Sequence, residues 1–194
     1  MSRLSSPEEL VKWAGTRDPR TIAEMLEISV HHLFHVESRL PGLTCYVRNR
    51  PSIFINDAYF ESLLRKHRDY NEDTLYNDET QVIGHELGHC CRHKDQLKAA
   101  PIKEYQIFDV RTAMEVEANQ FAAGILIDKE EMIDLLNSQM TILQVASAMR
   151  VNVNMLIYRI ESLRNEGYKF NGLPYIPKNN FIGGIHGLGS SEWR

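Results

Sequence analysis

The chain is predicted to adopt an α+β fold that is mainly helical and includes one small antiparallel sheet. Apolar residues recur at helical spacing over several segments, most clearly over 110–125. Two short runs, 43–47 and 52–56, have strand character and flank the turn-forming run 48–51, which predicts a β-hairpin. The 194 residues are 43% hydrophobic and 25% charged, so the chain can bury the core of a soluble domain.

Two short helices are expected at the N-terminus. The run Ser6-Pro7-Glu8-Glu9 combines a capping serine, an early proline and acidic first-turn residues, which are typical of a helix start. Asp18 before Pro19 opens a second helix, which should extend to about Leu26.

The segments around the hairpin are less regular. Residues 28–36 before the hairpin are expected to form a strand or a strand-like turn, and a helix over 58–68 should follow it. The segment 63–77 is long and charged, and we interpret it as a lid, a binding loop or an exposed connection.

The centre of the chain is predicted to be helical. Helices are expected over 78–94 and 108–127, with a loop near 101–105 between them. Asp128 can cap a further short helix over 129–137, because an aspartate accepts hydrogen bonds from the first main-chain N–H groups of a helix.

The C-terminal part is expected to contain a helix-turn-helix-like module and an irregular tail. Helices over 141–149 and 154–166 flank a short break. Arg159 and Arg164 lie on the second helix, but apolar residues dominate it, which favours packing or substrate docking over DNA contact. We therefore divide the chain into a core (1–137), a helical module (138–167) and a tail (168–194).

The most informative motif is the run His85-Glu86-Leu87-Gly88-His89, a His-Glu-x-x-His pattern. Residues four apart lie on one face of an α-helix, so both imidazoles can reach one Zn²⁺. The carboxylate of Glu86 would then lie beside the metal, where it can take a proton from water. We expect His85 and His89 to be metal ligands and Glu86 to be the general base.

A catalytic zinc usually takes three protein ligands and leaves one position open. The metzincin pattern requires a third histidine six residues after the second, and it fails here because position 95 is Asp. His93 has poor geometry for binding the metal. It is expected to be either a cation near the helix C-terminus or a group that contacts a metal ligand. We favour Glu115 over Glu117 as the third ligand, because Asn119 lies one turn after Glu115 and can orient a ligand histidine.

Other histidines and cysteines are weaker candidates for metal ligands. Three histidines near the N-terminus are expected to be surface or packing groups, and two cysteines of the metal helix are expected to be small buried residues. These residues are His31, His32, His35, Cys90 and Cys91.

Composition limits the setting in which the protein works. The net charge of −4 gives no basis for strong nonspecific binding to nucleic acids. No apolar run is long enough to span a bilayer, and the N-terminus has no apolar region typical of a secretory signal. Three cysteines, of which two are adjacent, suit a reducing compartment, so we expect a cytoplasmic protein.

The chain resembles the ImmA/IrrE-type zinc metallopeptidases of bacteria, phages and mobile elements over roughly residues 7–166. The resemblance lies in an Asp-Pro helix start (16–23), a strand before the metal helix (53–56), the motif 85–89 and the third-ligand run 115–123. It implies that the core is a zincin-like domain of the gluzincin type, and such proteins often carry a helical module after it.

The resemblance also implies a substrate, namely a transcriptional repressor, often of the helix-turn-helix type, whose cleavage releases gene expression. Two alternatives remain. One is a noncatalytic zinc module that binds a repressor or DNA, and the other is a toxin–antitoxin component whose active site is blocked by a partner protein. The group that stabilises the oxyanion is left open among five residues: Tyr70, Tyr76, His93, Tyr105 and Arg111.

Overall fold

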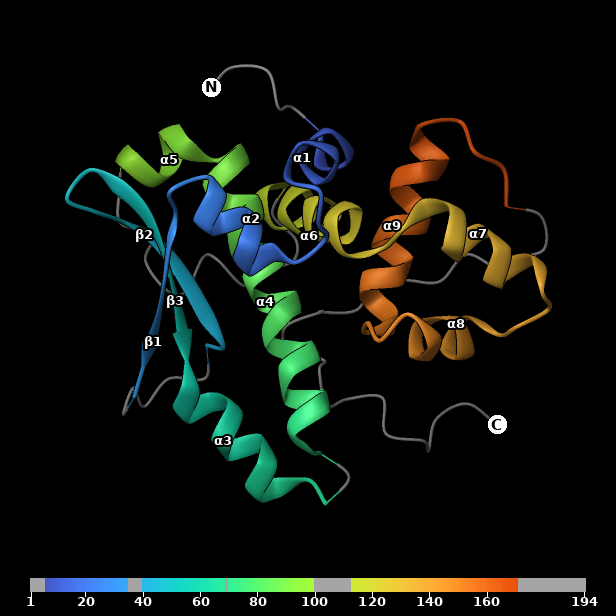
Figure 1. The fold of residues 1–194 in the computed structure, drawn as a ribbon, viewed down its shortest axis with the longest axis horizontal. Coiled ribbons are helices and arrows are strands. Elements are labelled where there is room, and N and C mark those ends of the chain that lie inside the picture. The colour runs from blue at the N-terminus through green and yellow to red at the C-terminus, as the bar shows by residue number, and fades with distance from the viewer. Residues whose placement is uncertain (1–5, 35–39, 69, 100–112, 171–194) are drawn as a thin grey trace.

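The computed structural model describes residues 6–34, 40–68, 70–99 and 113–170 (Figure 1). Helices dominate this part of the chain, and one three-stranded sheet lies on one side of the long helix α4. The strands are β1 (Ser29–Leu33), β2 (Gly42–Val47) and β3 (Arg50–Asn56). The helices are α1 (Pro7–Ala14), α2 (Pro19–Met25), α3 (Asp57–Lys66), α4 (Glu72–Arg92), α5 (Lys94–Ala99), α6 (Ala113–Leu126), α7 (Lys129–Asn137), α8 (Ile142–Ala148) and α9 (Val153–Asn165). The predicted α+β class, with mostly helices and a small sheet, is confirmed.

The sheet has the order β1-β3-β2 and is mixed, whereas we predicted an antiparallel one. β2 and β3 form the predicted antiparallel hairpin, but β1 pairs in parallel with the other edge of β3. The hairpin turn is tighter than expected. Arg48 and Asn49 both have positive φ angles, 49° and 63°, as a two-residue type I′ turn requires, so β3 already begins at Arg50.

The predicted helix starts are confirmed at their capping residues. Ser6 forms a capping box with Glu9, and the side chain of Asp18 accepts from the main-chain N–H groups of Arg20 and Thr21. Asp128 caps α7 and also pairs with Arg17, which ties the start of α7 to the N-terminal region.

Helix α4 begins six residues earlier than predicted, so the reading of 72–77 as a lid, loop or connection is wrong. Asn71 caps the helix by accepting from the N–H of Thr74. Just before the cap, Tyr70 is buried and donates its hydroxyl to Asp78 at 2.9 Å. This internal contact explains why a charged segment is ordered here as helix. A further short helix, α5, follows α4 and was not predicted.

Two apolar clusters form the core, and α6 contributes to both. The first joins α1–α4 with the sheet and includes Phe121 and Ile125 of α6. The second joins Ala122 and Ala123 of α6 to the helices α7, α8 and α9. The C-terminal helices therefore share an apolar cluster with α6. In the described residues, no helix is both long and apolar enough to cross a membrane.

Candidate metal centre

The site forms at a close contact between α4 and α6. At this point Gly88 of α4 faces the main chain of α6, and a Cβ atom on Gly88 would lie only 2.9 Å from the carbonyl oxygen of Ala118. The absence of a side chain on Gly88 therefore allows the two helices to touch along their backbones. This contact brings Glu115, one turn before Ala118, up to the two histidines of the motif.

Three side chains converge in this buried place: His85, His89 and Glu115. The Nε2 atoms of the two imidazoles are 3.1 Å apart. The Nε2 atom of His85 is 3.2 Å from Oε2 of Glu115, and that of His89 is 3.3 Å from Oε1. Ligands of a tetrahedral zinc lie about 3.3 Å from one another when each is about 2.0 Å from the ion. The separations therefore fit a tetrahedral metal ion.

The hydrogen bonds of the ligand rings also suit a metal. Nδ1 of His85 lies 2.9 Å from Oδ1 of Asn119, and an amide oxygen can only accept, so this nitrogen carries the hydrogen. The neutral ring then turns the lone pair of Nε2 toward Glu115. Two such lone pairs facing each other at 3.1 Å would repel, so a cation between them stabilises the arrangement.

His93 holds the second ligand ring in the same way. Its Nδ1 atom lies 3.0 Å from Nδ1 of His89, and its Nε2 atom lies 3.2 Å from a carboxylate oxygen of Glu117. With Glu117 accepting from Nε2–H, Nδ1 of His93 accepts from Nδ1–H of His89. The lone pair of His89 is again left on Nε2, facing the metal position.

The charges of the site follow from burial and from these contacts. Burial raises the pKa of Glu115, but hydrogen bonds with His85 and His89 outweigh it and lower the pKa below the usual value. Burial opposes protonation of His85, yet the carboxylates of Glu115 and Glu86 raise its pKa. Burial and the neighbouring His89 lower the pKa of His93. This direction, together with its contact with His89, favours the second of our two interpretations, in which His93 hydrogen-bonds to a ligand.

The expected general base, Glu86, follows His85 in the sequence and is fully buried on α4. Its Oε2 atom accepts a hydrogen bond of 2.8 Å from the hydroxyl of Thr44 on β2. Its Oε1 atom is also buried and has no hydrogen-bond partner in the described part of the chain. One carboxylate oxygen is thus held by the sheet, and the other is free to accept a proton.

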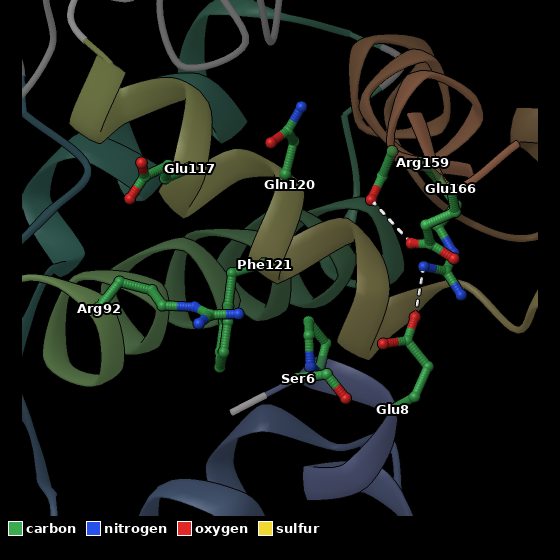
Figure 2. Close-up of a pocket in the computed structure, with 10 residues that line it drawn as sticks. Ser6, Glu8, Arg92, Glu117, Gln120, Phe121, Arg159 and Glu166 are labelled. Carbon is green, nitrogen blue, oxygen red and sulfur yellow. Dashed lines mark hydrogen bonds and ion pairs between the residues drawn. The ribbon is translucent and has the colours of Figure 1, made fainter. Parts of the chain in front are cut away.

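The structure separates the two glutamates that the sequence offered as third ligand. Glu115 is buried at the two histidines, whereas the side chain of Glu117 is 59% exposed and contacts His93 instead. Glu117 also lines a cavity of about 390 Å³ beside α6. Figure 2 shows Glu117 and Arg92 on one side of this cavity and the ion pair of Glu8 with Arg159 on the other.

Several weaker candidates lie in other contacts. His31 stacks on Phe54, and His32 pairs with Asp57, so neither joins the cluster. Of the residues considered for the oxyanion, Tyr70 is bonded to Asp78 and Tyr76 is 56% exposed on α4. Three more predictions concern residues outside the described ranges, and they are His35, Tyr105 and Arg111.

Sequence reasoning missed the contact that Thr44 makes with Glu86. Thr44 lies in the predicted strand, but its partner Glu86 is 42 residues away in the sequence, and no local pattern predicts a contact over that separation. The position of His93, four residues after His89, did give a signal, because that spacing places the two rings on one helix face.

Comparison with known protein families matches residues 70–161 to the family described as the IrrE N-terminal-like domain, a family of peptidases. The match runs from Tyr70 through α4 and α6 into α9 and contains every side chain of the cluster described above. Neither the curated proteins nor the solved structures gave a match. Residues 70–161 thus match the IrrE N-terminal-like domain family, which confirms the resemblance seen in the sequence.

Proposed function

We propose that the protein is a zinc-dependent endopeptidase with His85, His89 and Glu115 as zinc ligands and Glu86 as general base. The observation that carries the proposal is the buried triangle of two imidazole nitrogens and a carboxylate, with separations of 3.1–3.3 Å. The match to a peptidase family supports the reaction type. The site has three protein ligands in place of the four that close a purely structural zinc site, and the buried Glu86 is near enough for its charge to raise the pKa of His85.

The reaction would use few groups of the chain. A zinc ion in the site supplies a Lewis acid for a water molecule and for the carbonyl group of the scissile peptide. Glu86 accepts the proton of the attacking water at Oε1 and then delivers it to the leaving amine. Asn119 and His93 keep the two ligand rings oriented throughout.

The edge of β2 is the place where an extended peptide would bind. β2 lies against α4, with Thr44 in contact with Glu86, and in the described residues only β3 pairs with it. A peptide that adds to the open edge would be held through main-chain hydrogen bonds close to Glu86. Such binding tolerates many side chains.

For the substrate we propose a transcriptional repressor of the helix-turn-helix type, cleaved so that its target genes are expressed. The support is the family resemblance, since no side chain of the described site identifies a particular protein. The proposed zincin-like core and helix-turn-helix-like module agree with the order of elements, in which α8 and α9 follow the metal helices.

Direct DNA binding through α9 is the less favoured function. Seven consecutive residues of this helix, 154–160, are buried, and they include Arg159, which pairs with Glu8 of α1 at 2.5 Å. A recognition helix must expose basic side chains to a groove, so α9 is better suited to packing. A noncatalytic module or a toxin–antitoxin component would keep the zinc ligands but would not need Glu86.

The test compares the wild-type protein with Glu86→Gln. We expect the zinc-loaded wild type to cleave the repressor encoded beside its gene, with no cleavage after addition of a chelator. Glu86→Gln should retain zinc and fold but lose cleavage by about 100-fold or more, because it removes the general base. Mass spectrometry of new N-termini provides the measurement. Cleavage by Glu86→Gln at the wild-type rate would exclude Glu86 as the base, and a stable complex without cleavage by either protein would favour the binding module.

A further inference from the structure

We propose that Thr44 is a positioning residue for Glu86: its hydroxyl fixes Oε2 and so assigns proton transfer to Oε1. The inference rests on the proposed function, because it concerns the same general base. It adds a residue of the sheet to a site otherwise built from two helices.

The contact between Thr44 and Glu86 is short and shielded from water. The hydroxyl oxygen of Thr44 lies 2.8 Å from Oε2 and 3.2 Å from the main-chain oxygen of Glu86. Thr44 is 2% exposed and Glu86 is fully buried, so water does not compete for this bond. A hydrogen bond to a charged group in such surroundings is among the stronger ones in a protein.

The direction of the hydrogen bond follows from the chemistry of its partners, and a third residue agrees with it. Cys90, one turn after Glu86, donates its thiol hydrogen to the hydroxyl oxygen of Thr44 over 4.0 Å. A hydroxyl has a single hydrogen, and a carboxylate accepts only. Thr44 therefore accepts from Cys90 and donates its one hydrogen to Oε2, which at 2.8 Å is nearer than the main-chain oxygen of Glu86 at 3.2 Å. The hydroxyl of Thr44 then has no hydrogen left to donate to Oε1.

The backbone of β2 is built to bring Thr44 this close. Gly42, two residues earlier on the same face of the strand, lies directly over α4. A Cβ atom at Gly42 would lie 2.7 Å from a methyl group of Val82 and 3.5 Å from Cγ of Glu86. Because Gly42 has no side chain, the strand can approach the helix and the hydroxyl of Thr44 can reach the carboxylate.

Two distinct oxygens then divide the work of one carboxylate. Oε2 accepts a hydrogen bond from Thr44, while Oε1 is buried and has no partner among the described residues. In the reaction the O–H bond of water breaks, its proton goes to Oε1 and the hydroxide oxygen bonds to the peptide carbon. The proton then leaves Oε1 for the amine nitrogen as the C–N bond breaks, which restores the carboxylate. Thr44 exchanges no proton.

The experiment uses the full chain loaded with zinc and measures binding of acetohydroxamic acid by calorimetry. A hydroxamic acid binds zinc as an anion after its proton passes to an adjacent carboxylate, so its affinity reports on the orientation of Glu86 without any substrate. Four variants are compared with the wild type: Thr44→Val, Thr44→Ser, Thr80→Val and Glu86→Gln. Zinc content and melting temperature are measured for each.

Thr44→Val keeps the shape of the side chain but removes its hydroxyl, and we expect the hydroxamate to bind about tenfold more weakly, as for the loss of one hydrogen bond to a charged group. Thr44→Ser restores the hydroxyl and should restore the affinity, which a purely structural role of Thr44 would not predict. Thr80→Val is the matched control, since the hydroxyl of Thr80 on α4 has no hydrogen-bond partner among the described residues. It should bind like the wild type.

The outcomes separate this inference from the proposed function. Equal affinities of Thr44→Val and wild type, with weak binding by Glu86→Gln, would overturn the role of Thr44 only. So would an affinity of Thr44→Ser as low as that of Thr44→Val. Wild-type protein that binds no zinc, or that binds the hydroxamate no better than Glu86→Gln, would overturn both.

Discussion

At the scale of single residues, the two ligand imidazoles are oriented by partners of different kinds. His85 has a neutral amide, Asn119, behind it, and His89 has a second imidazole, His93, whose other nitrogen meets a carboxylate. Both arrangements place the ring hydrogen on Nδ1 and the lone pair on Nε2. The amide can act only as an acceptor at this contact, so Asn119 is the more restrictive of the two partners.

Replacement of Asn119 by Ala should weaken zinc binding by about 10- to 100-fold, because the ring of His85 loses the acceptor that fixes its tautomer. Gln120→Ala is the control, since Gln120 is the next residue on α6 but lines the cavity beside it. Zinc affinity is measured by competition with a chromophoric chelator. Equal affinities of the two variants would contradict the orienting role of Asn119.

A second buried carboxyl group should make stability depend on pH. Burial raises the pKa of Asp78 to about 6, although the hydrogen bond from Tyr70 lowers it. In the unfolded chain this pKa is near 3.8, so between pH 4 and 6 the folded state binds more protons than the unfolded state. The contribution of Asp78 to folding is therefore most favourable below pH 4 and declines until the pH exceeds about 6.

Asp78→Asn removes this ionisation and keeps an oxygen that can accept from Tyr70. At pH 7.5 the variant should be more stable than the wild type, by on the order of 1–3 kcal/mol. The difference should shrink as the pH falls from 6 toward 4. Urea unfolding of both proteins across this range gives the measurement, and a difference that does not change with pH would argue against an ionised Asp78 in the folded protein.

At the scale of the elements, the contact between α4 and α6 decides whether Glu115 reaches the histidines. Two glycines of α4 face α6, and they differ in the space around them. A Cβ atom on Gly88 would clash with the backbone of Ala118 at 2.9 Å, whereas one on Gly84 would meet the side chain of Leu126 at 3.4 Å. A backbone cannot move aside as a side chain can, so only Gly88 is required for the close approach.

Gly88→Ala is expected to destabilise the protein by about 1–3 kcal/mol, because it forces two packed helices apart. It should also lower zinc affinity, since Glu115 lies one turn from the clash. Gly84→Ala should be neutral or stabilising by up to about 1 kcal/mol, because alanine favours a helix more than glycine does. Thermal unfolding and zinc competition check both variants. If Gly84→Ala lost as much stability as Gly88→Ala, the proposed difference between the two glycines would be wrong.

The elements themselves were largely predictable where local signals act alone. The caps at Ser6, Asp18 and Asp128 mark their helices correctly because capping depends on residues within one turn. The start of α4 was missed because its ordering depends on Tyr70 and Asp78, a buried contact inside a segment that looks exposed. The parallel pairing of β1 was missed for a similar reason, since the sequence of a single strand does not determine which strand it pairs with.

At the scale of the whole molecule, the candidate site joins parts that are distant along the chain. The pair His85 and His89 was predictable from its spacing, and the structure places Glu115 beside them, as Asn119 had suggested. Thr44 could not be assigned in this way, since its partner lies on a different element. The site also lies next to both cores, because α6 packs with α4 on one side and with α9 on the other.

Because the ligands come from both α4 and α6, a bound metal should stabilise the entire fold. Zinc that binds only the folded state adds about 3–4 kcal/mol at concentrations of 100–1,000 times its Kd. A chelator should therefore lower the melting temperature of the zinc-loaded protein, measured by calorimetry, by several degrees. Glu115→Gln should abolish most of this difference, because it removes the only ligand on α6 in the proposed set. Glu117→Gln, the same change two residues later on the same helix, should retain most of it. If Glu117→Gln abolished the difference and Glu115→Gln did not, the ligand set proposed here would be wrong.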